Sequence, residues 1–178
     1  MSGGPLKFDP VAEARRQWEE HGWQHAASGM AAVTSVMRAQ QIFLSRVDLA
    51  LRPFELTFAR YEVLALLSFT RKGEMPLGKI GARLQVHAAS VTNAIDRLEQ
   101  HHLVARRRHP TDGRTTLARI TPAGRRRAAD ATVVLNEVFA NIGLTSDQSQ
   151  LLTDLLAVIR RDVGDYTEAL DPGTADRT

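Results

Sequence analysis

The stretch from Leu77 to Gly124 holds the side chains best suited to chemistry, and that chemistry is the binding of a polyanion. Between Lys79 and Arg127 there are eleven basic residues and three acidic ones. The rest of the 178-residue chain carries twelve basic and seventeen acidic residues, so the basicity is concentrated in one segment. A face made basic only for solubility would not segregate its signs in this way. The charge pattern therefore favours a phosphate backbone as the partner.

Residues 88–101 are predicted to form a helix with one apolar side and one small, polar side. Val91, Ile95 and Leu98 are separated by four and three positions, so in a helix they share the inward side. The opposite side and its flanks carry the candidates for contact with nucleic acid, which are Ala89, Ser90, Thr92, Asn93 and Arg97. Small side chains near the start of this helix would allow close approach to base edges, because bulky ones would hold the helix off the groove floor.

Two further predicted elements flank this helix in the sequence. Residues 77–84 have the apolar spacing of a short helix, with Leu77, Ile80 and Leu84 facing inward. Residues 103–108 and 115–120 are predicted to be the strands of a hairpin, joined by a turn that contains Pro, Asp and Gly. The predicted order is therefore a short helix, a turn, a second helix and a basic hairpin. Proteins use this order to place one helix in a DNA groove and one loop beside it.

The segments before this region are predicted to be helical. Asp9 resembles an N-cap followed by Pro10 at the first helical position, which would open a helix that runs to about residue 20. Apolar positions three or four apart predict a long helix over residues 24–51, and Pro53 would end it. Thr57 is a candidate cap for the next helix.

The segments after it are predicted to be helical as well. Thr121 begins a helix after the hairpin, and a capping-box sequence begins the last helix at Thr145. On the other side of the region, ahead of the short helix, Gly73 and Pro76 bracket a turn. Residues 171–173 are expected to end the ordered chain. The apolar stripes on the first long helix and on the last helix have no obvious partner within a single domain, which indicates self-association.

The composition is that of an ordinary globular protein and excludes several classes of site. Hydrophobic residues make up 43% of the chain and charged residues 24%. The chain has no cysteine, which excludes disulfides, thiolate zinc sites and thiol-based sensors of oxidants. It has no apolar run of about 18 residues that could span a bilayer. Its N-terminus lacks a basic-then-apolar export signal, so we expect a cytoplasmic protein.

Several segments, taken in order, resemble the MarR family of bacterial transcription regulators. They are LT at 56–57, YEVL at 61–64, TNAIDRLE at 92–99, LV at 103–104, DGR at 112–114, and Leu117 followed by ITPAG at 120–124. Each is weak alone, but the ordered set is specific, and the resemblance covers about residues 25–168. It implies a mainly α fold with a small β wing, in which each subunit of a homodimer carries a winged helix-turn-helix. Many members of the family repress genes and release the operator when a small phenolic or anionic ligand binds.

The resemblance and the helix pattern together predict five segments. These are a flexible arm at 1–10, N-terminal dimerisation helices at 11–52, a winged helix-turn-helix at 53–122, C-terminal dimerisation helices at 123–170 and a flexible tail at 171–178. The expected partners are double-stranded DNA, a second copy of the chain and a small-molecule effector. We expect no membrane association, no cofactor, no metal and no enzymatic activity.

The resemblance also assigns roles to the residues on the outward side of the second helix. Ala89, Ser90, Thr92 and Asn93 match the start of the family's recognition helix. Asn93 is the best candidate for base contact, because an amide can pair bidentately with adenine. Arg97 lies further along the same side, where it would meet phosphate or another residue of the subunit.

The hairpin matches the family's wing. Asp112 and Arg114 match its signature, in which the Arg reaches into a minor groove while the Asp holds the loop and that Arg in place. A narrow minor groove concentrates negative potential, so an Arg there responds to groove width. Four other basic residues near the wing are assigned to phosphate contact or to support of the wing, and they are Arg106, Arg107, Arg108 and Arg125.

One position departs from the family pattern. Where the family usually has Gly, at a helix C-terminus that favours left-handed backbone, this chain has His102. Because His tolerates that conformation less well than Gly, we expect the helix end to be shaped differently here. The pair formed with His101 could suggest a metal site or a proton switch, but no third ligand has suitable spacing, and we interpret both as ordinary surface residues.

The helix ahead of the family core resembles the N-terminal extension of urate-responsive members of the family. Those members use a Trp, an acid and two Arg residues to hold the ligand, and the nearest matches here are Trp18, Glu62 and Arg106. Their recognition-helix Arg corresponds to Ala94, which weakens the urate assignment. The candidate ligand-lining residues are Arg15, Trp18, Glu62 and Arg106. We favour the other interpretation, in which Trp18 and Trp23 pin the extra helix onto the dimer.

Two other classes of function remain open from the sequence. An enzyme is disfavoured because no nucleophile motif, phosphate-cradling Gly loop or metal-ligand cluster is present. The other alternative keeps the winged helix but uses it as an architectural or protein-interaction module that has no small-molecule effector. A preference for one DNA sequence over random DNA would separate a regulator from a packaging protein.

Overall fold

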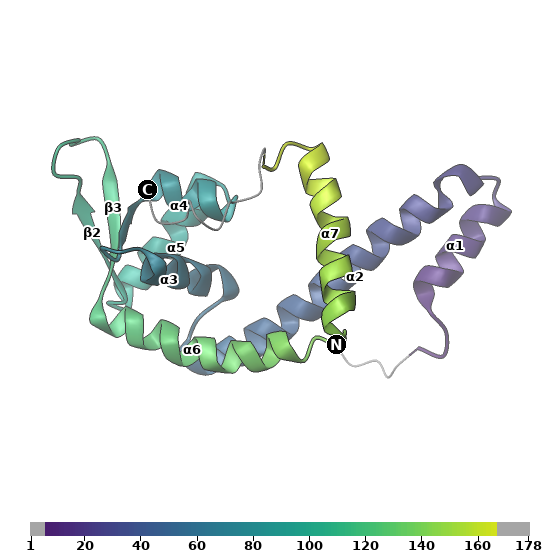
Figure 1. Ribbon diagram of the computed structural model, residues 1–178, viewed down its shortest axis with the longest axis horizontal. Helices are drawn as coiled ribbons and strands as arrows, with labels where there is room; N and C mark the ends of the chain where they lie inside the picture. Colours follow the sequence, from purple (N-terminus) through teal and green to yellow (C-terminus); the bar gives the residue numbers. More distant parts are fainter. Residues whose placement is uncertain (1–5, 167–178) are drawn as a thin grey trace. The chain divides into compact units, whose positions relative to one another are not determined.

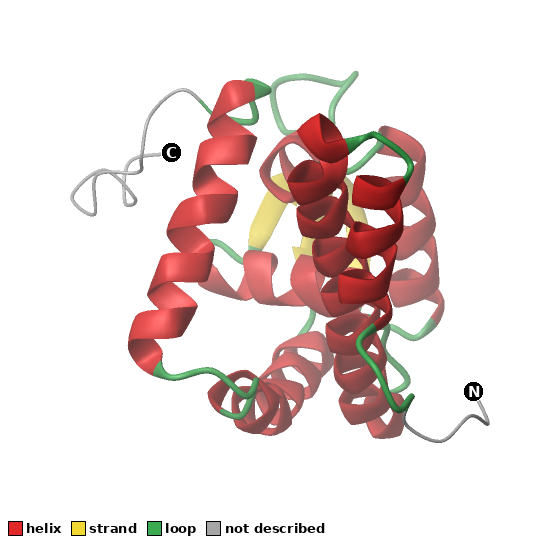
Figure 2. Ribbon diagram, turned by 90° about the vertical axis from the view of Figure 1, so that its right-hand side faces the viewer, coloured by secondary structure: helices red, strands yellow, loops and turns green. Residues whose placement is uncertain are grey.

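The computed structural model describes residues 6–166 of the chain, and these form two compact units that divide between residues 140 and 141. Helices make up most of the described residues, and the strands form one small sheet (Figures 1 and 2). The elements of the first unit are α1 (Pro10–Glu20), α2 (Gln24–Leu51), the 3₁₀ turn η1 (Arg52–Phe54), α3 (Phe58–Phe69), β1 (Glu74–Pro76), α4 (Leu77–Leu84), α5 (Ala88–Gln100), β2 (Val104–Arg108), β3 (Thr116–Ile120) and α6 (Pro122–Ala140). The second unit contains α7 (Ser146–Asp162). The fold class predicted from the sequence is confirmed, whereas the predicted tail at 171–178 and half of the predicted arm lie outside the described residues.

The helix ends follow the capping signals in the sequence. The Asp9 carboxylate accepts a hydrogen bond from the backbone N–H of Val11 at 2.9 Å, and Pro10 occupies the first helical position of α1. The Thr57 hydroxyl caps α3, and Thr145 forms a complete capping box with Gln148 at the start of α7. The predicted starts of α1, α3 and α7 are confirmed. The helices begin at these positions because the caps satisfy N–H groups that have no partner within the helix.

The sheet contains one strand that the sequence analysis missed. Strands β2 and β3 form the predicted hairpin, with Val104 opposite Ile120 and Arg108 opposite Thr116. The segment interpreted only as a turn, residues 73–76, contains β1, which pairs antiparallel with β3 and gives the strand order β1-β3-β2. Strand β1 is three residues long and ends in a proline, so nothing in its own sequence marks it as a strand, and its edge position is where proline is tolerated.

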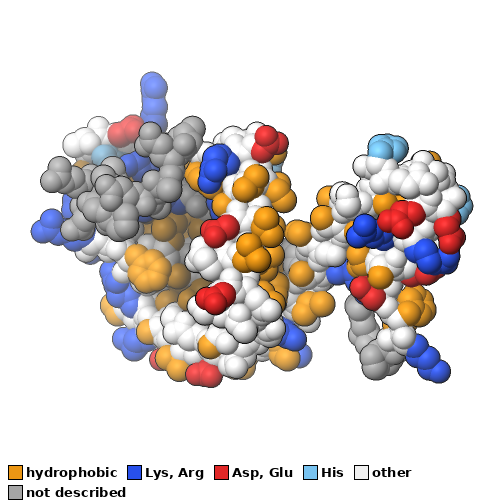
Figure 3. All heavy atoms as spheres, turned by 45° about the vertical axis from the view of Figure 1, so that its right-hand side comes forward, with side chains coloured by type: hydrophobic (Ala, Val, Ile, Leu, Met, Phe, Trp, Pro, Cys, Tyr) orange, Lys and Arg blue, Asp and Glu red, His pale blue; other side chains and the backbone are white. Residues whose placement is uncertain are grey.

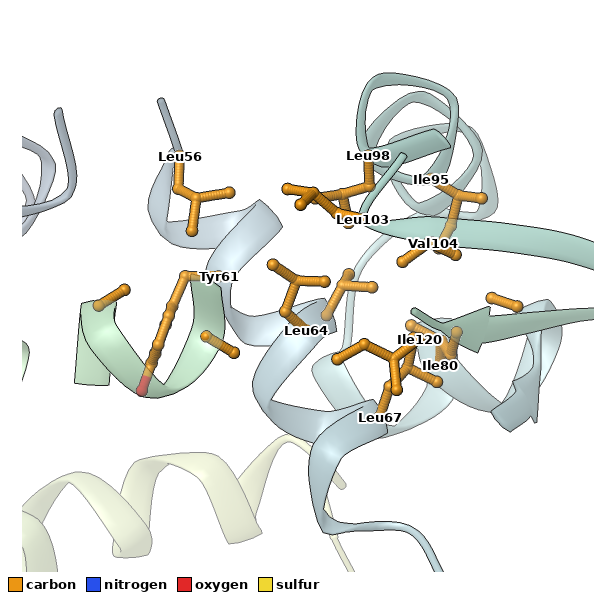
Figure 4. Close-up of a cluster of buried hydrophobic side chains, with 14 of the residues drawn as sticks. Leu56, Tyr61, Leu64, Leu67, Ile80, Ile95, Leu98, Leu103, Val104 and Ile120 are labelled. Atoms are coloured by element: carbon orange, nitrogen blue, oxygen red, sulfur yellow. The ribbon is translucent and has the colours of Figure 1, made fainter. Parts of the chain in front are cut away.

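The core of the first unit lies between α3 and the elements around it (Figure 4). Leu64 and Leu67 of α3 are fully buried against side chains from α4, α5 and the wing, including Ile80 and Ile95. Burial of a side chain of this size contributes about 1.5–3 kcal/mol to folding relative to exposure. Tyr61 lies at the edge of this cluster and hydrogen-bonds through its hydroxyl to the Thr132 hydroxyl of α6 at 2.9 Å. This core fixes α5 and the hairpin on one scaffold.

Several apolar residues remain exposed on the helices outside this core. On α2, Val33 is 61% exposed, Met37 59% and Leu49 69%. In the second unit, Leu151, Leu155, Ile159 and Val163, which were predicted to form a stripe, are likewise exposed. Figure 3 shows patches of exposed hydrophobic side chains on the surface that this view presents. Across residues 6–166, no helix is long and apolar enough to cross a membrane.

Candidate nucleic-acid interface

The turn between α4 and α5 sets how the second helix is presented. Gln85 ends α4 in the left-handed region at φ +52°, which turns the chain sharply out of the helix. Gly81 allows the two helices to approach, because a Cβ there would come within 3.3 Å of both the Val86 carbonyl oxygen and a methyl group of Val91. Val91, Ile95 and Leu98 are each at most 2% exposed, so the predicted inward side of α5 is confirmed.

The opposite side of α5 is open to solvent along its length. The sequence-predicted contact residues on it are all exposed, and they are Ala89, Ser90, Thr92, Asn93 and Arg97. The Arg97 guanidinium donates to the Gln100 side-chain oxygen at 3.3 Å, so this cation already has a partner on its own helix. The first two turns therefore present a small polar surface, and the charge lies further along.

The tip of the hairpin is held by Asp112. Its carboxylate accepts hydrogen bonds from the Arg114 backbone N–H at 3.1 Å and from the Thr115 hydroxyl at 2.6 Å. Backbone bonds from His109 N–H to the Thr115 carbonyl and from Thr115 N–H to the Asp112 carbonyl close the same turn. Asp112 thus orders the backbone that carries Arg114, while the Arg114 side chain stays exposed. The bonds from Thr115 and from Arg114 N–H lower the pKa of Asp112 below its ordinary value of 3.8.

We expect the wing turn to depend on the Asp112 carboxylate as an acceptor. Asp112→Ala should speed amide exchange at Arg114 and Thr115, whereas Asp112→Asn, which keeps an acceptor oxygen, should change it little. Because the folded turn lowers the pKa of Asp112, the bonds stabilise the turn above pH 3.8 and are lost as the pH falls through the lowered value. The NMR shift of the Arg114 amide should therefore titrate below pH 3.8. Titration above that pH would contradict the assignment.

A hollow of about 710 Å³ lies between the wing and the start of α4. It is lined by three potentially cationic side chains, Lys79, His109 and Arg114, and by Asp112. The sequence analysis counted Lys79 among the basic residues of this segment, but it gave neither Lys79 nor His109 a role. The signal for Lys79 was its position near the start of the short helix, and the signal for His109 was its position beside the DGR motif.

The three consecutive arginines of β2 have different environments. Arg107 and Arg108 are exposed, whereas Arg106 is directed toward α5. The Arg106 guanidinium forms ion pairs with Asp96 and Glu99, each at 2.5 Å, and its backbone N–H donates to Glu99 at 2.9 Å. The backbone and side-chain bonds from Arg106 lower the pKa of Glu99. Of the two roles that the sequence left open for Arg106, this arrangement corresponds to support of the wing.

Arg125 also has internal contacts. Its guanidinium donates to the Ser68 carbonyl at 3.3 Å and packs against Gly73 so closely that a Cβ there would lie 2.3 Å from a guanidinium nitrogen. Gly73 has φ +67°, in the left-handed region that favours glycine, and its carbonyl accepts from the Ile120 N–H. These contacts join the end of α3, β1 and the start of α6, so Arg125 too supports the base of the wing.

The expectation about His102 is wrong. His102 adopts φ +58°, the same left-handed conformation for which the family uses Gly. The Leu103 N–H donates to the Leu98 carbonyl, and the Thr121 hydroxyl donates to the His102 carbonyl at 2.8 Å. These bonds from both sides hold the backbone of this turn, so the helix ends as a left-handed cap despite the cost of a side chain there.

The candidate ligand-lining residues do not come together within one chain. Arg15 and Trp18 lie on α1, which packs along α2, whereas Arg106 lies on β2 at the opposite end of Figure 1. Arg15 pairs with Glu19 at 3.0 Å, and the Trp18 ring meets the Trp23 ring edge-on at 5.2 Å. The two tryptophans therefore join the end of α1 to the start of α2, a contact that fits a packing role.

Glu62, the remaining member of that candidate set, lies apart on α3. It is partly buried, and the loss of hydration raises the pKa of its carboxyl. Its helix, α3, is separate from the elements that carry the tryptophans, because Trp18 lies on α1 and Trp23 is the N-cap residue of α2.

Comparisons with known proteins show which proteins have a similar sequence. The sequence model described as the MarR family matches residues 56–116, which run from the start of α3 through the wing turn. YdgJ of Bacillus subtilis (strain 168), an uncharacterised HTH-type transcriptional regulator, is 31% identical over 109 residues, 59% of this chain and 64% of that protein. MhqR of the same organism is 35% identical over 88 residues, 49% of this chain and 54% of that protein. The matched regions thus span less than two thirds of these two curated relatives.

Solved structures match over a larger share of their length. A mutant of MarR from E. coli complexed with operator DNA has a TM-score of 0.69 over 75% of this chain and 96% of that one, at 20% identity, which shows a shared fold. Sco5413, a MarR family transcriptional regulator from Streptomyces coelicolor, has a TM-score of 0.72 and 45% identity, and the match covers 79% of this chain and 99% of that one. At that identity over nearly the whole of the other protein, with the helix-turn-helix and wing described above, the chain belongs to the MarR family.

Proposed function

We propose that this protein is a sequence-specific DNA-binding transcription regulator that acts as a homodimer in the cytoplasm and represses the genes next to its operator. The observation that carries the proposal is the pairing of two exposed surfaces on one rigid scaffold. The small polar side of α5 and the Arg-bearing wing tip both project from the core that Leu64, Leu67, Ile80 and Ile95 form.

Each surface suits a different groove of DNA. The start of α5 is free of bulky side chains, which suits entry into the major groove, where Asn93 can pair with an adenine edge. Arg114 at the tip of an ordered turn suits an adjacent, narrow minor groove. The hollow lined by Lys79, His109 and Arg114 lies between the wing and the start of α4, where a phosphate strand next to the minor groove would pass.

The exposed apolar residues support the dimer. Val33 and Met37 on α2, and Leu151 and Ile159 on α7, are each about three-fifths exposed, an unusual exposure for a monomer. A two-fold dimer would bury such stripes and place two recognition helices on successive major grooves. We therefore expect a pseudo-palindromic operator with half-sites about 10 bp apart. A footprint over a single unpaired half-site would count against this.

The proposal includes release of the DNA by a small anionic or aromatic molecule. The supporting features are the half-buried carboxyl of Glu62 and the exposed Trp23, which offer a titratable group and an aromatic face. Because Arg15 and Trp18 lie far from Arg106 in one chain, a common site would need a residue from the second subunit. If no such molecule changes DNA binding, the effector part of the proposal fails and the DNA-binding part stands.

A titration against different duplexes tests the function. The full chain should form a dimer in sedimentation analysis and should bind a duplex from the region upstream of its own gene or of neighbouring genes. A regulator should prefer its site over random DNA by about 10³-fold or more, measured at one stated salt concentration. Equal binding to random and intergenic duplexes would instead support a sequence-neutral architectural protein.

Asn93→Ala should relax base preference at one position of each half-site. Loss of a bidentate contact to a base costs about 1–3 kcal/mol of discrimination, whereas binding to random DNA should hardly change. The measurement is a set of competition titrations with single base-pair substitutions across the half-site. Asn136→Ala, which removes the same side-chain amide from an exposed position on α6, is the matched control. Unchanged preference at every position would remove Asn93 from the base-contacting set.

A further inference from the structure

We propose that Arg106 is a positioning residue that fixes the wing to the recognition helix and does not itself contact DNA. This inference rests on the proposed function, because it explains how two DNA-contacting surfaces keep a constant separation. It concerns a cluster of three side chains, Arg106 on β2 and Asp96 and Glu99 on α5, called here the helix–wing clamp.

The helix–wing clamp uses most of the donors that Arg106 possesses. One terminal guanidinium nitrogen donates to Glu99 at 2.5 Å, and the other donates to Asp96 at 2.5 Å and lies 3.5 Å from the Thr92 carbonyl. Only 27% of the Arg106 side-chain surface is exposed, against 49% for Asp96 and 40% for Glu99. A planar guanidinium can bridge two carboxylates in this way, whereas a single phosphate contact would leave both acids unpaired.

The strand order gives the clamp a mechanical role. Strand β2 lies at the edge of the sheet, with β3 on one side. On the other side, the Arg106 backbone N–H donates to Glu99 at 2.9 Å, so the carboxylate of the recognition helix takes the place of a further strand. Strand β2 ends at Arg108, two residues beyond Arg106, and the wing tip follows it. The clamp therefore sits where movement of the hairpin would change the distance from Asn93 to Arg114.

The clamp also has an electrostatic role. Asp96 and Glu99 are two of the three acids in the basic segment between Lys79 and Arg127, and both lie on the helix that would enter the groove. Unpaired, these carboxylates would repel the phosphate backbone. Arg106 pairs with both acids and offsets one of their two charges, and Arg97 on the same helix offsets the other. The groove-facing part of α5 therefore stays close to neutral while Arg107 and Arg108 remain exposed.

The salt dependence of DNA binding separates a positioning role from phosphate contact. Each phosphate contact contributes about 0.9 to the slope of log K against log salt, so loss of one contact per subunit lowers the slope by about 1.8 for a dimer. We expect Arg106→Ala to weaken operator binding by about tenfold or more at fixed salt, with the slope unchanged. Arg107→Ala, the matched control one residue along the strand, should lower the slope. A slope lowered by Arg106→Ala as much as by Arg107→Ala would overturn the proposal.

A double-mutant cycle tests the coupling directly. If Arg106 acts only through the acids, Glu99→Gln should also weaken binding, and the variant with both changes should bind no worse than the weaker single variant. Additive losses would overturn the proposal, because they would mean that each residue acts on DNA by itself. Glu99→Gln keeps Arg106 and the shape of the acid, so it serves if Arg106→Ala fails to fold. Arg106→Lys should recover part of the affinity, since one ammonium can pair with one acid at a time.

A measurement without DNA tests the helix–wing clamp independently of the proposed function. Glu99→Gln should speed amide hydrogen exchange at Arg106 and along β2 more than along β3, since the Arg106 N–H loses a charged acceptor. Equal effects on both strands would show that the clamp only stabilises the whole fold and would overturn the positioning role. If the wild-type protein lacks sequence preference but β2 responds in this way, the proposed function fails and the clamp stands.

Discussion

Replacing Arg114 with alanine should weaken operator binding by about tenfold to a hundredfold, or about 1.4 kcal/mol for each factor of ten. The side chain is exposed at the tip of a turn whose backbone is held by Asp112 and Thr115, so it meets DNA with little cost of ordering. A dimer carries two copies of Arg114, so the substitution removes two contacts from each binding event. The slope of log K against log salt should fall by about one for each lost contact. Titration at three or more salt concentrations gives both quantities.

Two control variants make this result specific. Arg114→Lys keeps the charge but lacks the planar fork, so it should retain the salt slope while losing preference for a narrow minor groove. Arg38→Ala removes an exposed arginine from α2 and should leave the slope unchanged. If Arg114→Ala bound as wild type at every salt concentration, Arg114 would make no contact with DNA, and α5 would remain as the element that contacts the bases.

The helices could be predicted from sequence because their signals are local. The spacing of apolar residues gave α2 and α4 with the bounds that the structure has, and the caps at Asp9, Thr57 and Thr145 placed three helix starts. Strand β1 could not be predicted in this way. Its three residues form a strand only because β3 offers them hydrogen-bonding partners, and β3 lies about forty residues further along the chain.

The candidate site shows the same division between local and long-range information. The outward side of α5 followed from a period of 3.6 residues, so its exposed positions were named correctly. The role of Arg106 depended on which way one side chain of an edge strand turns, and β2 offers both faces. The helix end at His102 was mispredicted because its conformation is held by Thr121, nineteen positions away, and not by the identity of the residue itself.

The candidate ligand-lining residues lie apart within one chain for a related reason. A resemblance can match single residues, but it does not show that they meet within one subunit. Helix α1 packs along α2, which carries Trp18 away from the wing, and Glu62 lies on a third element. The candidates named from the sequence have the right chemical type. In a single chain they lie apart, because the long helix α2 separates α1 from the wing.

Gly124→Ala should destabilise the winged domain although alanine is the better helix former. A Cβ at this position would lie 2.1 Å from the Leu103 carbonyl oxygen and 2.9 Å from a side-chain carbon of Ile120. Relief requires α6 to move away from the start of β2. That movement would break the bonds from the Thr121 N–H and hydroxyl to the Leu103 carbonyl, at 3.0 and 3.2 Å. Overpacking of this kind costs about 1–3 kcal/mol, which exceeds the gain of about 0.8–1 kcal/mol in helix propensity.

The measurement is urea denaturation at a fixed protein concentration, since a dimer's stability depends on concentration. Gly29→Ala is the matched control, because this glycine lies in α2 with nothing within 4 Å of a Cβ. It should raise the free energy of unfolding by about 0.5–1 kcal/mol. If the free energy of unfolding fell for Gly124→Ala and rose for Gly29→Ala, the destabilisation would come from the contact with Leu103. Equal stabilisation by both would mean that α6 is free to move from β2, and the base of the wing would then be less rigid than the positioning of Arg114 requires.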